Sequence, residues 1–65
     1  MRIMRLKEVI EKTGLAKSTV YNLISQGKFP KQIDLGARSV GWVDTEIEEW
    51  LLSKIELRDS EGRNL

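Results

Sequence analysis

The chain has 65 residues, with 11 lysines and arginines against 10 aspartates and glutamates, and a net charge of +1. A chain of this size forms a single domain whose hydrophobic core supplies only about 3 to 5 kcal/mol, which leaves little room for a deep catalytic cleft. It contains neither cysteine nor histidine, so disulfides are excluded and the commonest metal ligand and general base are absent. We therefore expect no enzyme activity, no bound metal and no cofactor.

Apolar residues occur only in short runs along the chain. The longest unbroken run is Trp50, Leu51 and Leu52, far below the roughly 20 residues that a membrane-spanning helix needs. The first five residues include two arginines and lack the apolar segment of a signal peptide. We predict a cytoplasmic protein that makes no membrane contact.

The small net charge conceals an uneven distribution. Residues 1–42 carry eight bases against three acids, whereas residues 43–65 carry three bases against seven acids. A basic front half and an acidic back half suit a protein that presents one face to a polyanion. Ordinary surface charge that keeps a domain soluble is the alternative explanation.

Two short amphipathic helices are predicted in the first half of the chain. Apolar residues recur at helical spacing over residues 5–13 and again over residues 17–26. Gly14 follows the first segment and Gly27 the second, and glycine readily takes the left-handed conformation that ends a helix. The core that the two helices share is predicted to consist of Leu6, Val9, Leu15, Val20 and Leu23.

A small β-hairpin is predicted next. Ile33 and Leu35 alternate with polar residues, as do Val40 and Trp42, and the two runs flank residues 36–38. Because an isolated hairpin is only marginally stable in water, we expect its apolar side to pack on the helices.

A third helix is predicted to begin at Asp44, which can cap it, with Thr45 and Glu48 as an alternative capping box. Its buried stripe is predicted to consist of Ile47, Trp50 and Leu51. Apolar residues become sparse after this helix, so we expect a domain over residues 1–55 and a frayed or disordered tail over residues 56–65.

These elements predict a mainly α-helical fold with a small β-hairpin, arranged as a winged helix-turn-helix with three helices and a wing. In such a fold the first helix braces the second, which enters the major groove of DNA. The residues left for the outer faces of the second helix are Lys17, Ser18, Thr19, Tyr21, Asn22 and Gln26. Two helices around a glycine turn also occur in proteins that bind no nucleic acid, so the spacing alone leaves that alternative open.

The outward side chains of the second helix suit the recognition of DNA. Asn22 and Gln26 can pair with adenine edges, and Ser18 and Thr19 can contact bases or phosphates. Lys17 lies at the start of the helix, among backbone amides that have no partner within the helix.

Further candidate contacts lie outside this set. Arg38, near the tip of the hairpin, either reaches a phosphate or a narrow minor groove or is a solvated turn residue. Tyr21 either places its hydroxyl on a phosphate or covers the edge of the core with its ring. Trp42 and Trp50 fall on apolar stripes, so we expect them in the core rather than stacked on bases. Lys28 completes the predicted DNA-binding set.

Several short motifs, in the order in which they occur, resemble the AlpA family of phage and prophage regulators. They are Arg5-Leu6-Lys7-Glu8-Val9, Thr13-Gly14-Leu15, Lys17-Ser18-Thr19-Val20-Tyr21, Gly27-Lys28-Phe29-Pro30, Leu35-Gly36, Arg38-Ser39-Val40-Gly41-Trp42 and Glu46-Ile47-Glu48-Glu49-Trp50-Leu51. The resemblance implies a fold similar to the winged helix-turn-helix of excisionases and MerR-like regulators. It also implies a role in transcription, or in excision with an integrase, on double-stranded DNA. The recognition positions that it implies are Lys17, Ser18, Thr19, Tyr21 and Asn22, with Arg38 in the wing.

The chain departs from the family pattern in three ways. Ala16 stands where the family usually has serine or a similar helix cap, and the loss of a good cap costs about 0.5 to 2 kcal/mol. Asn22 stands where arginine is common in the family, which predicts a different DNA target. The chain lacks the long C-terminal coiled coil through which MerR-like proteins dimerise, so we expect a monomer or a weak homodimer.

A protein-interaction module is the competing functional hypothesis. The third helix is acidic, and its exposed carboxylates can hold an integrase or RNA polymerase partner. Glu48 and Glu49 form no convincing catalytic acid/base pair, because neighbouring helical positions point in different directions.

Overall fold

The computed structural model describes residues 1–62. Its elements in chain order are β1 (Ile3–Met4), α1 (Leu6–Thr13), α2 (Lys17–Ser25), β2 (Ile33–Gly36), β3 (Ser39–Val43) and α3 (Asp44–Gly62). The three strands form an antiparallel sheet in the order β1-β3-β2. The prediction of three helices with a small hairpin is confirmed, and the arrangement is that of a winged helix-turn-helix.

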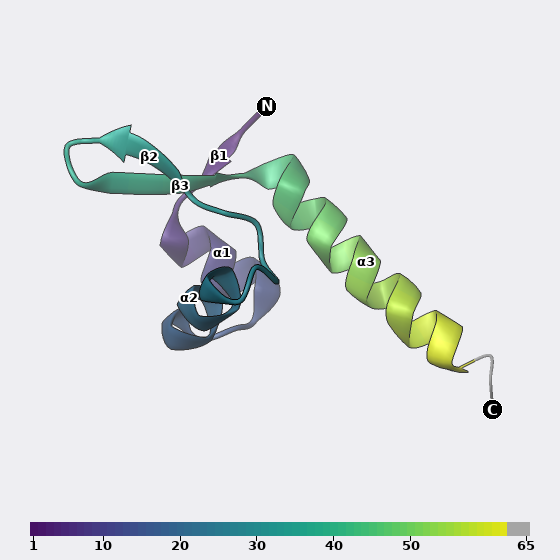
Figure 1. Ribbon diagram of the computed structural model, residues 1–65. Coiled ribbons are helices and arrows are strands. Elements are labelled where there is room, and N and C mark those ends of the chain that lie inside the picture. Colours follow the sequence, from purple (N-terminus) through teal and green to yellow (C-terminus); the bar gives the residue numbers. More distant parts are fainter. Residues whose placement is uncertain (63–65) are drawn as a thin grey trace.

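The hairpin and the last helix extend to opposite sides of the helical pair. Figure 1 shows the β2–β3 hairpin reaching out to the left of α1 and α2, while α3 runs away to the lower right. The molecule is therefore elongated, with principal dimensions of 50, 25 and 19 Å. Within residues 1–62, none of the helices combines the length and apolar character needed to cross a membrane.

The core lies where α1, α2 and α3 meet one face of the sheet. Four of its side chains, those of Val9, Val20, Trp42 and Ile47, are completely buried. All four are core residues in the sequence-based prediction, on the evidence of their apolar stripes. The other predicted members, which are Leu6, Leu15, Leu23, Trp50 and Leu51, pack around this centre and are partly buried. Burial of Met4 and Phe29 is not predicted by the sequence pattern.

The turn between the first two helices is held by local hydrogen bonds. Gly14 has the positive φ of 74° that a left-handed helix end requires, and its N–H donates to the carbonyl of Ile10 at 2.8 Å. The Thr13 hydroxyl donates to the carbonyl of Val9 at 2.7 Å, within α1. These contacts set the angle at which α2 leaves α1.

The N-terminal strand β1 is not predicted by the sequence, because two residues are too few to show a periodic pattern. It pairs with β3, so that Met4 lies opposite Trp42. The backbone pairing continues past the end of the two strands, because the N–H of Asp44 donates to the carbonyl of Arg2 at 2.9 Å. The Asp44 carboxylate accepts the N–H of Arg2 at 3.2 Å.

The hairpin packs on the helices with only one of its two strands. Val40 and Trp42 of β3 point into the core, but Ile33 pairs with Gly41, whose side-chain position lies on the opposite face of the sheet. Ile33 and Leu35 are consequently 38% and 44% exposed. The expectation that the apolar side of the hairpin packs on the helices is therefore correct for β3 and wrong for β2.

The start of α3 is fixed by tertiary contacts rather than by a local cap. Asp44 is the first residue of the helix, and its carboxylate accepts the backbone N–H of Arg2. Glu48, predicted as part of a capping box, instead forms an ion pair with Lys12 of α1. A partly exposed pair of this kind contributes at most about 1 kcal/mol, but it joins α3 to the helix-turn-helix.

Helix α3 is longer than the sequence pattern predicts, because it continues past residue 55 to Gly62. Residues 56–58 are good helix formers and residues 56–59 contain neither glycine nor proline, so nothing in this segment ends the helix. The predicted frayed tail over residues 56–65 is thus helical as far as residue 62, and residues 63–65 lie outside the described part. The division into a domain of residues 1–55 and a tail stays a prediction.

The wing turn offers a direct test of backbone strain. Ala37 and Arg38 both have left-handed backbone, with φ of 49° and 63°, as a tight two-residue hairpin turn requires. Alanine resists this conformation and asparagine tolerates it, so we expect Ala37→Asn to raise the free energy of unfolding by about 0.5 to 1 kcal/mol. Urea denaturation measures this change, and an unchanged or lowered unfolding midpoint would contradict the assigned turn.

Candidate nucleic-acid interface

The outer surface of α2 carries a ridge of polar side chains. Ser18, Asn22 and Gln26 follow one another at intervals of four residues, so they share one face of the helix, and all three are exposed. Val20 is completely buried on the inner side and holds this face outward. Among the side chains of residues 1–60, those of the ridge take part in no hydrogen bond or ion pair. Their donors and acceptors are therefore free for a partner.

The amino-terminal end of α2 lacks a cap. Ala16 occupies the cap position with extended backbone and makes no side-chain hydrogen bond, and the first turn contains no acidic residue. This confirms the weak cap that the sequence predicts. Lys17 and Thr19 are both exposed in this first turn, where a positive helix end would favour a bound anion.

Tyr21 lies at the boundary between the core and the surface. Its ring packs edge-on against Trp42, with ring centroids 6.4 Å apart and an interplanar angle of 62°. The residue is half-buried, so its ring covers the edge of the core, which is one of the two roles that the sequence allows it. A contact between its hydroxyl and a phosphate remains a prediction.

Arg38 lies in the two-residue turn at the tip of the hairpin, where the sequence places it. It is exposed, and it forms no ion pair with a side chain of residues 1–60. The carboxylate of Asp34 accepts the N–H of Gly36 at 2.9 Å, so this nearby acid supports the turn rather than neutralising Arg38. The guanidinium is available at the far end of the wing.

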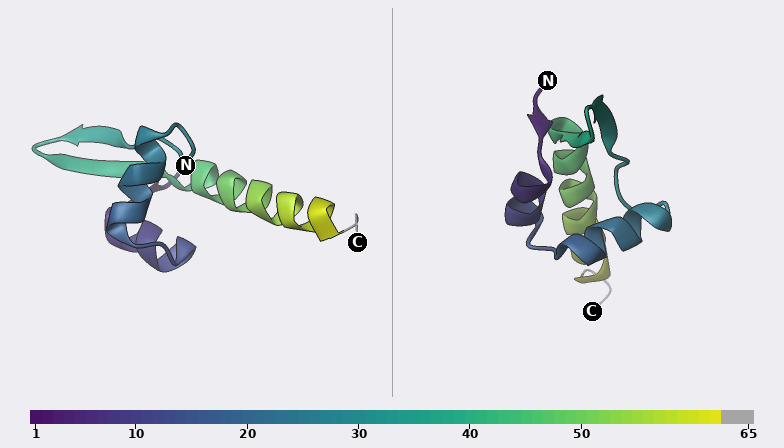
Figure 2. Two further views of the ribbon diagram at one scale, coloured as in Figure 1. Left: turned by 60° about the horizontal axis from the view of Figure 1, so that its bottom comes forward. Right: turned by 90° about the vertical axis from the view of Figure 1, so that its left-hand side faces the viewer.

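Helix α2 and the wing are both visible from the hairpin side of the molecule. Figure 2, right, looks at the molecule from the hairpin side: α2 lies lengthwise across the lower part, and the hairpin projects toward the viewer above it. The acidic helix α3 runs away from this side. Helix α3 therefore leads away from the wing, and the predicted contacts belong to α2, the segment after it and the hairpin turn.

Lys28 is exposed in the connector between α2 and β2. The sequence pattern points to this residue but not to Lys31, which is exposed in the same connector. A lysine in a loop lies outside any periodic pattern. Only the folded arrangement therefore distinguishes Lys31 from other surface lysines. Among the side chains of residues 1–60, no group of three or more acidic residues is placed to hold a metal ion.

Comparison with known proteins places these features in a family. Residues 2–55 match the family model described as "Prophage CP4-57 regulatory protein (AlpA)". The chain is 43% identical to the "DNA-binding transcriptional activator AlpA" of Escherichia coli K12, over 88% of this chain and 90% of the relative. It is 41% identical to the "Uncharacterized protein ORF88" of Enterobacteria phage P4, over 83% of this chain and 61% of the relative.

The missing cap of α2 can be restored by one substitution. In Ala16→Ser the new hydroxyl can accept a backbone N–H of the first turn, so we expect the free energy of unfolding to rise by about 0.5 to 2 kcal/mol. Chemical denaturation measures the gain, and Ala16→Val is the control because valine adds no acceptor and is as poor a cap as alanine. A serine variant no more stable than the parent and the valine variant would show that the cap site is already satisfied.

Proposed function

Because this chain belongs to the AlpA family of prophage regulatory proteins, we propose that it is a DNA-binding transcriptional regulator of a phage or integrated element. The observation that carries the proposal is the exposed ridge of Ser18, Asn22 and Gln26 on α2, whose side-chain polar groups have no partner among residues 1–60. A helix of this diameter fits the major groove, where base edges present a distinct pattern of donors and acceptors. A relative that shares 43% of its residues is named as a DNA-binding activator.

In this proposal the ridge reads the sequence and the basic residues hold the backbone. Asn22 and Gln26 can each form paired hydrogen bonds with an adenine edge, which discriminates against a wrong base by about 1 to 3 kcal/mol. Lys17 at the uncapped start of α2 supports a contact with a phosphate on one side of the groove. Arg38 at the wing tip reaches the neighbouring backbone or minor groove. Ser18, Thr19 and Tyr21 complete the contacts.

The target of the ridge can be found by selection from a mixture of DNA fragments. The protein is incubated with random-sequence and host DNA fragments, and the retained fragments are sequenced. We expect enrichment of a short motif that contains adenine where Asn22 or Gln26 reads the groove. Retention of fragments without any enriched motif would contradict sequence-specific recognition.

Lys17→Ala and Arg38→Ala test the backbone contacts. Each variant should bind the selected DNA more weakly at low salt, and each should lower the slope of log affinity against log salt by about 0.9, the value for one lost phosphate contact. Fluorescence anisotropy at several salt concentrations measures both effects. Arg58→Ala is the matched control, because Arg58 lies on α3, which leads away from the wing, and it pairs with Asp59 of the same helix. Unchanged affinity in both test variants, or salt-independent binding by the parent, would refute this mode of binding.

A regulator that is bound to DNA also has to contact the transcription or recombination machinery. The exposed part of α3 offers a surface for this contact. Leu52, Ile55 and Leu57 are 53%, 44% and 55% exposed, and Glu49 and Glu56 are exposed on the same helix. We propose that this surface engages an integrase or RNA polymerase subunit once the protein is on DNA. We also propose that the protein assists excision and that it functions as a monomer or a weak homodimer.

Charge reversal on α3 tests this partner contact. Glu49 is preferable to Glu48, because Glu48 is paired with Lys12 and its reversal would bring two positive charges together. We expect Glu49→Lys with Glu56→Lys to abolish activation or excision in a reporter strain while DNA affinity at physiological salt stays equal or rises. If the double variant keeps full regulatory activity, α3 has no such role. Sedimentation equilibrium of the parent protein checks the oligomeric state.

A further inference from the structure

The connector between α2 and β2 is anchored to the core at two backbone carbonyls. The indole N–H of Trp50 donates to the carbonyl of Lys28 at 2.7 Å, and the indole N–H of Trp42 donates to the carbonyl of Pro30 at 3.2 Å. Between them, Phe29 is 5% exposed and packs edge-on against Trp50, with ring centroids 4.8 Å apart. Three consecutive residues of this segment are therefore fixed, although it belongs to no helix or strand.

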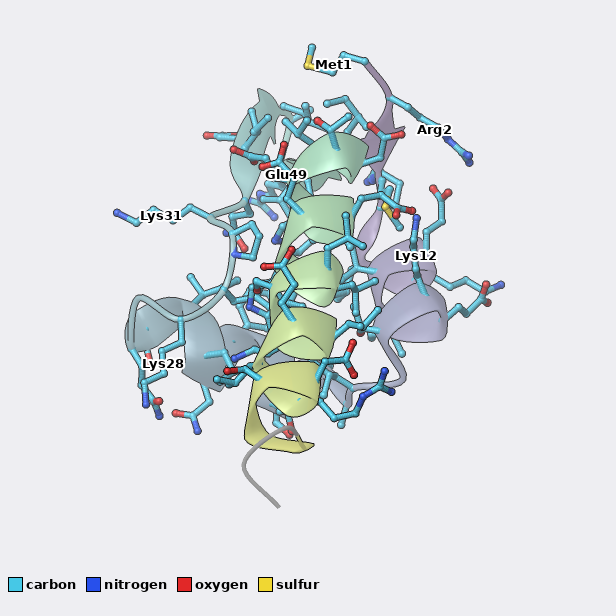
Figure 3. The ribbon with its side chains drawn as sticks, turned by 90° about the vertical axis from the view of Figure 1, so that its right-hand side faces the viewer. Met1, Arg2, Lys12, Lys28, Lys31 and Glu49 are labelled. Atoms are coloured by element: carbon cyan, nitrogen blue, oxygen red, sulfur yellow. The ribbon has the colours of Figure 1, made fainter. Side chains whose placement is uncertain are left out.

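This anchoring leaves two lysines free on the outside. Lys28 and Lys31 are both exposed, and neither forms an ion pair with a side chain of residues 1–60. Figure 3 shows both side chains projecting from the same flank of the molecule, while Lys12 lies on the opposite flank. Glu49 lies on α3, and neither lysine extends toward it in this view.

The position of this flank relates it to the DNA-binding surface. The connector begins directly after the carboxyl-terminal end of α2, at Gly27 and Lys28, and leads to the wing. It therefore borders the surface that α2 and the hairpin share (Figure 2, right). A duplex with its major groove on α2 has its sugar-phosphate backbones on either side of the helix, and this border lies beside one of them.

We propose that Lys28 and Lys31 form a backbone clamp that binds DNA phosphates beside the groove read by α2, with Trp42 and Trp50 as the positioning residues. The inference rests on the proposed function and adds Lys31 and the two indole hydrogen bonds to it. Lysine ammonium groups are compact point charges, suited to phosphates rather than to the planar paired contacts that distinguish bases. The clamp therefore adds affinity without sequence preference. Fixing the connector lowers the entropy lost when the lysines bind.

The salt dependence of DNA binding tests the clamp. In the double variant Lys28→Ala/Lys31→Ala, two lost phosphate contacts should lower the slope of log affinity against log salt by about 1.8. The order of preference among DNA sequences should stay the same. Lys31→Ala alone should lower the slope by about 0.9, whereas Lys12→Ala, on the opposite flank, should leave it unchanged. All variants are measured on a random-sequence duplex and on the selected target, at a temperature where circular dichroism shows each to be folded.

Trp50→Phe tests the positioning role. Phenylalanine keeps an aromatic ring against Phe29 but removes the N–H that holds the Lys28 carbonyl. We expect a smaller salt slope than that of the parent in this folded variant. The combination of Trp50→Phe with Lys28→Ala/Lys31→Ala should have the same slope as the double lysine variant alone. A purely structural tryptophan would change the unfolding midpoint and leave the slope of the folded protein as it is.

The outcomes separate this inference from the function on which it rests. If the double lysine variant keeps the salt slope of the parent while Lys17→Ala and Arg38→Ala lower it, the clamp is overturned. DNA binding by α2 and the wing would then stay in place. A change in sequence preference in the double variant would also overturn it, because the lysines would then read bases. A parent protein that binds no DNA would overturn both proposals.

Discussion

Burial of the Trp42 indole is the interaction on which the rest of the structure depends. The side chain is fully buried, and the burial of a tryptophan is among the largest hydrophobic contributions that a small domain can make. It lies on the central strand opposite Met4 of β1, contacts Tyr21 of α2, and donates a hydrogen bond to the Pro30 carbonyl. The sheet, the recognition helix and the connector thus share one anchor, and their relative positions are set together.

A second set of contacts orients the acidic helix. Asp44 is bound to the backbone of Arg2, and Glu48 to Lys12 of α1. These links cross from the start of α3 to the N-terminal strand and the first helix, so α3 leaves the domain on the side away from the hairpin (Figure 1). The negative charge that it carries is thereby kept from the surface that would face phosphates, where it would weaken binding.

Local sequence rules are broken at two points, and both adjoin predicted DNA contacts. Ala16 leaves the start of α2 uncapped beside Lys17. The Ala37–Arg38 turn holds two non-glycine residues in left-handed backbone. Each departure costs stability that a small core can barely spare, and such departures tend to occur at functional sites. At the start of α2, backbone amides without a partner in the helix lie beside Lys17. In the hairpin turn, the strained backbone places Arg38 at the tip of the wing.

The sequence by itself determined the helix-turn-helix, the hairpin, the AlpA resemblance and the burial of Trp42, because helical spacing, strand alternation and glycine positions are local signals. Only the tertiary structure decided which face of β2 is exposed, that Met4 and Phe29 are buried, and that Asp44 and Glu48 serve distant partners instead of capping α3. These outcomes depend on strand register and on contacts between residues far apart in the chain, which a local pattern does not contain. The same reason explains why the sequence pattern does not point to Lys31: its place beside α2 follows from two indole hydrogen bonds made elsewhere in the fold.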